Sequence, residues 1–155
     1  MGLKHGPFRT GLARFGERVT ASGVSLPGAT FEGVFTITGG DVIATLLYAR
    51  VTTGVGAGAS NIRMVYSPPS GSDFNFSGLT SVASAGTGQL IAVDAASNSP
   101  LQSDPVVSPA DHTGDPGWIF GPGEIGWLAA GATSGEVEWY IHYHALEPDA
   151  AVTAS

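Results

Sequence analysis

The order of hydrophobic and polar positions predicts a protein built from short β-strands. In segment 31–38, Phe35 and Ile37 belong to an apolar face that alternates with a more polar one, while segment 42–53 is apolar on both faces. A period of two is typical of a half-buried strand, and two apolar faces suit a central strand between layers. Residues 39–41, Gly-Gly-Asp, form a hairpin-type turn between them. The expected core residues of the second strand are Val42, Ile43, Leu46 and Leu47.

Turn-forming residues divide the rest of the body into similar segments. Further strands are expected at 61–67, 73–83 (two short strands or a bend), 88–95, 124–131 and 136–146. Segment 96–117 contains four prolines, which exclude a central strand there and leave at most an edge strand at Val106 and Val107. The last residues, 148–155, are expected to form a tail.

These segments predict an all-β fold of about eight or nine strands, with no helix in the body and no internal repeat. An antiparallel β-sandwich and a jelly-roll-like barrel both fit this order. The composition agrees, because 23 Gly and 10 Pro suit many tight turns and 43% hydrophobic residues can fill a core. The length of 155 residues suits one domain.

The first 30 residues differ from the body. We expect residues 1–30 to form a basic N-terminal arm and linker, and residues 31–155 to form the β-sandwich domain. Apolar residues recur in the arm near helical spacing, but Gly11 and Gly16 interrupt them. Each glycine costs about 1 kcal/mol in a helix interior. A short helix or an extended segment docked on another surface is therefore expected.

Charge is unevenly distributed along the chain. The formal net charge is −7, and ten acidic residues with no Lys or Arg occupy the stretch from Asp73 to Asp149. An acidic body repels nucleic acid and anionic membranes, so neither is an expected partner. The arm holds four of the six cations, and both a solvated tail and a segment that binds an acidic partner remain open for it. These cations are Lys4, Arg9, Arg14 and Arg18.

The absence of cysteine excludes disulfides, thiolate metal sites and a cysteine nucleophile. No apolar run approaches the ~20 residues that span a bilayer. The basic N-terminus lacks the apolar segment of a signal peptide. The expected location is the cytosol, or a larger assembly that forms there.

Candidate chemistry concentrates near the C-terminus, where His142 and His144 stand two residues apart and Glu147 and Asp149 follow. Two histidines at this spacing on a strand can share a metal ion. Period-two geometry gives this strand a core face, which comprises Val137, Trp139, Ile141, Tyr143 and Ala145. The histidines lie on the opposite, polar face, together with Glu136, Glu138, Tyr140 and Leu146.

This segment resembles the first motif of the cupin family in part. That motif has five residues between a Gly and His-x-His, then three or four residues before a Glu, and a later Gly. Here six residues separate Gly135 from His142, two separate His144 from Glu147, and no Gly follows. The chain ends before a second motif could supply another His. A metal site at His142, His144 and Glu147 remains an alternative, but a polar face that packs against a neighbouring subunit is favoured, and no cofactor is expected.

Other motifs are sparse. Segment 111–117 holds Asp111, His112 and Asp115 but lacks the bidentate Glu of a calcium loop, so a surface turn is expected. No serine-hydrolase, zinc-protease or phosphate-loop motif is present. No catalytic residue is predicted, and we expect the protein not to be an enzyme. The tryptophans are expected to anchor a core or an interface: Trp118, Trp127 and Trp139.

The end of the chain resembles small virion proteins of tailed bacteriophages, the β-sandwich proteins that decorate or cement the head. The matching residues are 122–135, Val137, Trp139, Tyr143, Leu146, Pro148 and 152–154. The resemblance implies a homo-oligomer, with a trimer favoured, that binds the major capsid protein and performs no catalysis. It also implies a location on the virion surface after assembly in the host cytoplasm.

Two groups of residues are predicted to form the interface. They are Lys4, Phe8, Arg9, Leu12, Arg14, Phe15 and Arg18 of the arm, and Tyr140, His142 and His144 of the strand face. A tail or head-fibre component built from the same domain is an alternative of the same class. A glycan-binding module that stacks sugars on Trp118 or Tyr140 is another.

Overall fold

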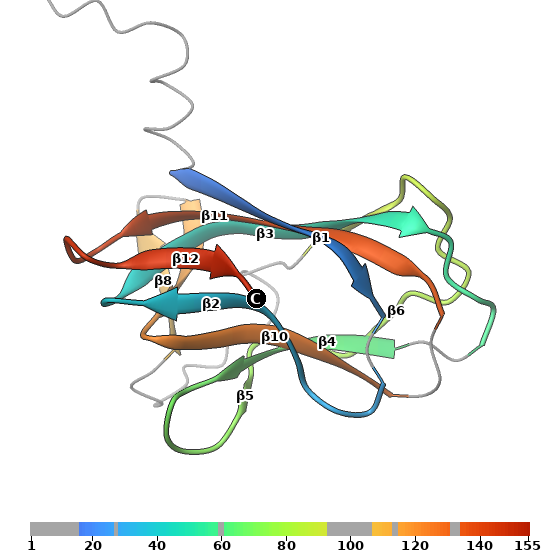
Figure 1. The fold of residues 1–155 in the computed structure, drawn as a ribbon, viewed down its shortest axis with the longest axis horizontal. Coiled ribbons are helices and arrows are strands. Elements are labelled where there is room, and N and C mark those ends of the chain that lie inside the picture. Colours follow the sequence, from blue (N-terminus) through green and yellow to red (C-terminus); the bar gives the residue numbers. More distant parts are fainter. Residues whose placement is uncertain (1–15, 27, 59–60, 93–106, 113–114, 131–133) are drawn as a thin grey trace, which may run out of the picture.

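The described part of the chain is all-β. The computed structural model describes residues 16–26, 28–58, 61–92, 107–112, 115–130 and 134–155. In these residues twelve strands form two antiparallel sheets. They contain no helix, and hence none long and apolar enough to cross a membrane. The sheets face each other as the layers of a sandwich (Figure 1), which confirms the predicted fold class and excludes a closed barrel.

Each sheet has six strands. Sheet A has the order β1 (Glu17–Ser25), β11 (Glu136–Ala145), β3 (Val42–Thr53), β9 (Asp115–Phe120) and β8 (Val107–His112), with β7 (Leu90–Ala92) also paired to β3. Sheet B has the order β12 (Ala151–Ala154), β2 (Glu32–Thr38), β10 (Gly123–Ala130), β4 (Asn61–Ser67) and β5 (Phe74–Asn75), with β6 (Thr80–Ser81) also paired to β4. The strands β3 and β4 begin and end where the sequence pattern predicts.

Two edge strands lie in segments that the sequence pattern assigns to the linker and the tail. The strand β1 pairs with β11 in sheet A, and β12 pairs with β2 in sheet B. A bulge between Ala21 and Val24, with Gly23 at a φ of 68°, interrupts the alternation of β1. In β12 only Val152 is buried. Both strands therefore carry too little alternation to be recognised before their partners are known.

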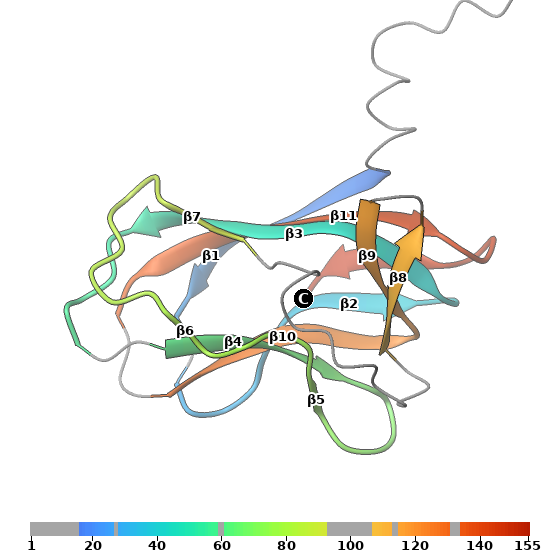
Figure 2. The same cartoon turned by 180° about the vertical axis from the view of Figure 1, so that it is seen from behind.

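The proline-rich segment forms more strand than predicted. Pro109 lies in β8, which is the edge of sheet A, where a missing N–H is tolerated. Pro116 lies in the part of β9 that pairs with β8 only, since β3 pairs with residues 118–120. Figure 2 shows β8 and β9 turning from sheet A toward sheet B at one end of the sandwich.

The core lies between the sheets and is rich in aromatic rings. Trp118, Trp127 and Trp139 are all buried, as predicted. Val42 and Leu47 are also buried, but the prediction that Ile43 and Leu46 belong to the core is wrong. The strand β3 has apolar residues on both faces, yet only one face meets sheet B. A register shift opposite His142 and Tyr143 leaves Leu46 on the other face.

Candidate functional site

The predicted polar face of β11 lies on the outer face of sheet A, the side turned away from sheet B. Tyr140, His142 and His144 are half-buried there. On the opposite side, four of the five predicted core residues are buried, whereas Ala145 is exposed at the end of the strand. The division of this strand into two faces is therefore correct along nearly its whole length.

Arg18 joins this face from β1. It pairs with His142 in the ladder between β1 and β11, and its guanidinium carbon lies 5.8 Å from the centre of the Tyr140 ring. The geometry is that of a cation–π contact. The other six predicted interface residues lie outside the described residues: Lys4, Phe8, Arg9, Leu12, Arg14 and Phe15.

A stack of rings runs across the strands of this face. The rings of Tyr48 and Tyr140 are nearly parallel, with centroids 4.7 Å apart and an interplanar angle of 13°. Tyr48 also stacks against His142 at 6.4 Å. Because β11 lies between β1 and β3, Arg18 and Tyr48 flank Tyr140 from opposite sides. The Tyr140 ring is thus stacked on Tyr48 and lies beneath the Arg18 guanidinium, and Trp118, the other predicted sugar platform, is buried.

Glu138 connects this stack to β1. Its carboxylate accepts hydrogen bonds from the Tyr140 hydroxyl and, at 2.7 Å, from Ser22 Oγ. These two bonds, aided by Arg50 and Arg18, hold the pKa of Glu138 below its ordinary value. The same bond to Glu138, together with burial, raises the pKa of Tyr140. The pair therefore holds one negative charge on Glu138 and a proton on Tyr140 at neutral pH.

The environment of His142 favours its uncharged form. Burial lowers its pKa, and the positive charge of Arg18 lowers it further. An uncharged imidazole can stack on Tyr48 without the cost of burying a cation.

The proposed metal ligands do not come together. Among the described residues, no three His, Asp or Glu side chains form a group that could hold a metal ion. His142 and His144 share one face of β11, but Glu147 lies beyond the strand. A Cβ built on Gly40 would lie 2.0 Å from Glu147 Oε2, so this side chain folds over the β2–β3 turn. The backbones of Asp111, His112 and Asp115 lie in β8 and β9, and their side chains lie outside the described part.

Several residues of this face were not predicted from the sequence. Tyr48 and Arg50 of β3 pair with Tyr140 and Glu138 of β11. Leu90 of β7 pairs with Arg50. The alternation of Tyr48 and Arg50 with Leu47, Ala49 and Val51 could have placed these two residues on the outer face. However, which of them meet β11 depends on strand register, which the sequence does not specify.

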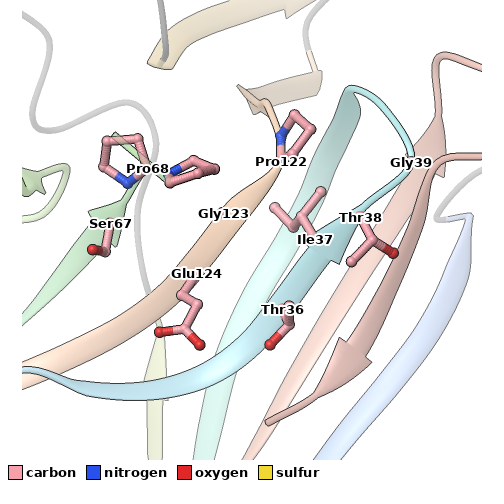
Figure 3. A pocket seen from close by; sticks show the side chains of 10 residues that line it. Thr36, Ile37, Thr38, Gly39, Ser67, Pro68, Pro122, Gly123 and Glu124 are labelled. Atoms are coloured by element: carbon pink, nitrogen blue, oxygen red, sulfur yellow. The ribbon is translucent and has the colours of Figure 1, made fainter. Parts of the chain in front are cut away.

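A second feature is a hollow of about 500 Å³ in sheet B (Figure 3). Thr36 and Thr38 of β2, Glu124 of β10 and Pro68 are among its walls. Glu124 is the one ionisable side chain of its ten lining residues, so the hollow offers a single carboxylate among hydroxyl and apolar groups.

No protein-family model, no curated protein and no solved structure matches the chain.

Proposed function

We propose that the protein is a structural component of a tailed-phage virion that decorates or cements the capsid. It binds the lattice of the major capsid protein as a homo-oligomer, with a trimer as the favoured state. The resemblance of the C-terminal third to small virion proteins suggests this role. The acidic, cysteine-free composition and the β-sandwich fold are compatible with it.

The observation that carries the proposal is the chemistry of the outer face of sheet A. It combines stacked Tyr48 and Tyr140 rings with Arg18, Glu138 and the exposed side chain of Leu46. Tyr and Arg are enriched in protein–protein interfaces. The Tyr140 hydroxyl already donates to the Glu138 carboxylate, which suits packing against a protein surface better than turnover of a small substrate.

Native mass spectrometry of the full-length protein tests the proposal first, because it reports subunit number and bound metal together. A metal-free closed oligomer supports it. A monomer that carries one transition-metal ion per chain contradicts it and favours the cupin-like alternative at His142 and His144.

Binding to particles is the second test. The protein should cosediment saturably with particles assembled from the major capsid protein of the phage that encodes it. Binding to purified tails but not to such particles would instead favour the tail-component alternative.

The role of the arm is tested in the same assay. Deletion of residues 2–15 leaves β1, which begins at Glu17, intact. We expect the truncated protein to fold normally and bind particles more weakly, because the deletion removes Lys4, Arg9 and Arg14 together with their apolar neighbours. Unchanged binding would show that the β-sandwich alone makes the contact with the particle.

A further inference from the structure

The exposed apolar side chains of sheet A gather on its outer face. Leu46 is 37% exposed and Leu90 is 58% exposed, and both lie on strands that carry this face. Ile43 and Ile119 pair across β3 and β9 and are half-buried, and the residues that flank them in each strand point into the core. An apolar and aromatic surface of this kind is typical of a protein–protein contact.

Charges of both signs occur together on this face, whereas most other charged side chains of the described residues are acidic. Arg18 and Arg50 are two of the three cations among the described residues. They lie beside Glu138, and both lower its pKa. The other carboxylates of the described side chains include several at the ends of strands and in turns, whereas Arg63 is the one remaining described cation. The described carboxylates other than Glu138 are Glu17, Glu32, Asp41, Asp73, Glu124, Glu136, Glu147 and Asp149.

The mixed charge of this face favours a second copy of the chain as the partner. Two copies of a chain with a net charge of −7 repel each other when their acidic surfaces meet. On the outer face of sheet A, each copy presents both cations and carboxylates, so an arginine of one copy can pair with a carboxylate of the other. This face is therefore complementary to a second copy of itself.

Contacts within one chain already fix the aromatic side chains of this face before any association. Tyr140 is held between Tyr48 and Arg18, and its hydroxyl is bonded to Glu138. Fixing a side chain before association reduces the conformational entropy that binding would otherwise cost. The face thus combines apolar area, charges of both signs and fixed aromatic rings.

We infer that copies of this chain associate through the outer face of sheet A, with Leu46, Leu90, Tyr48 and Tyr140 at the centre of the contact. The inference rests on the proposed function only in requiring a homo-oligomer, and it adds the surface through which the copies meet. It does not depend on binding to a capsid.

Paired leucine substitutions test this surface. Leu46→Glu combined with Leu90→Glu places two carboxylates in the contact, and the self-dissociation constant should rise by at least about tenfold. Leu79→Glu is the matched control, since Leu79 is 55% exposed and lies between β5 and β6 in the sheet B region. Sedimentation velocity measures both. An unchanged dissociation constant in the double variant, or a monomeric unmodified protein, overturns the inference.

Thiol labelling provides a test that does not disrupt the contact. The chain has no cysteine, so Leu46→Cys and Leu79→Cys each introduce one reporter. Maleimide should label position 46 more slowly as protein concentration rises, and position 79 at a constant rate. Equal rates at all concentrations contradict the inference. Protection of position 46 that develops only after capsid particles are added also contradicts it and assigns the face to the capsid protein, which would leave the proposed function intact.

Discussion

Trp127 of sheet B and Trp139 of sheet A meet edge to face at the centre of the sandwich. Their ring centroids are 5.2 Å apart and their planes are 88° apart. Both side chains are fully buried. Edge-to-face aromatic pairs contribute about 0.5–1.5 kcal/mol beyond the area they bury. This contact therefore couples the two sheets directly.

A double-mutant cycle should reveal that coupling. Trp127→Leu and Trp139→Leu should each lower the free energy of unfolding by on the order of 3 kcal/mol, because each leaves a cavity between the sheets. The double variant should lose about 1 kcal/mol less than the sum. Urea unfolding followed by circular dichroism measures all four proteins. As a control, Trp118→Leu with Trp127→Leu should be additive, because the Trp118 ring contacts Phe76 instead.

Gly126 is required by a close approach of backbone and ring on the outside of sheet B. A Cβ at this position would lie 2.2 Å from the Glu32 carbonyl oxygen and 2.6 Å from Phe31 Cε2. Gly126→Ala should therefore lower the free energy of unfolding by about 1–3 kcal/mol. Gly86→Ala is the matched control, since no atom lies within 4 Å of its Cβ, and it should change stability by less than about 0.5 kcal/mol. Equal urea midpoints for the two variants would contradict this account.

The Tyr66 hydroxyl holds the turn through which the chain passes from sheet A to sheet B. It donates to the carbonyl oxygens of Pro122 at 2.8 Å and Gly121 at 3.1 Å, between β9 and β10. Burial, aided by the charge of Asp41, raises its pKa, so the hydroxyl remains a donor at neutral pH.

Removal of this hydroxyl should destabilise the fold modestly. Tyr66→Phe should cost about 1 kcal/mol in urea unfolding, since the two carbonyls lose their donor while the ring still packs on Phe120. Tyr48→Phe, on the half-exposed outer face of sheet A, should change stability by less than about 0.5 kcal/mol. A loss in the Tyr48 variant as large as in the Tyr66 variant would show that the turn contact is not responsible.

The sequence predicted the sheet layers better than the contacts between strands. Alternation in β11 was sufficient to place Trp139 inside and His142 outside, because a strand has only two faces. It was insufficient for Leu46, since β3 is apolar on both faces and a register shift decides where this side chain points. The pairing of Tyr48 with Tyr140 joins residues 92 positions apart and follows from strand order, which local pattern does not encode. The edge strands β1 and β12 were missed because a bulge in β1 and a single buried residue in β12 leave too little alternation.

The pH dependence of stability should report on His142. Its pKa in the folded protein lies below the ordinary value near 6.5, first through burial and then through Arg18. As pH falls below about 6.5, the unfolded chain binds a proton that the folded protein does not, so the unfolded state gains stability. The free energy of unfolding should therefore decrease between about pH 6.5 and 5, and His142→Gln should make that decrease smaller. Arg18→Gln should reduce it only in part, because burial by Tyr48 and its other neighbours remains. Urea unfolding at each pH measures the slope, and identical slopes for the His142 variant and the unmodified protein would show that the folded environment does not disfavour protonation of this side chain.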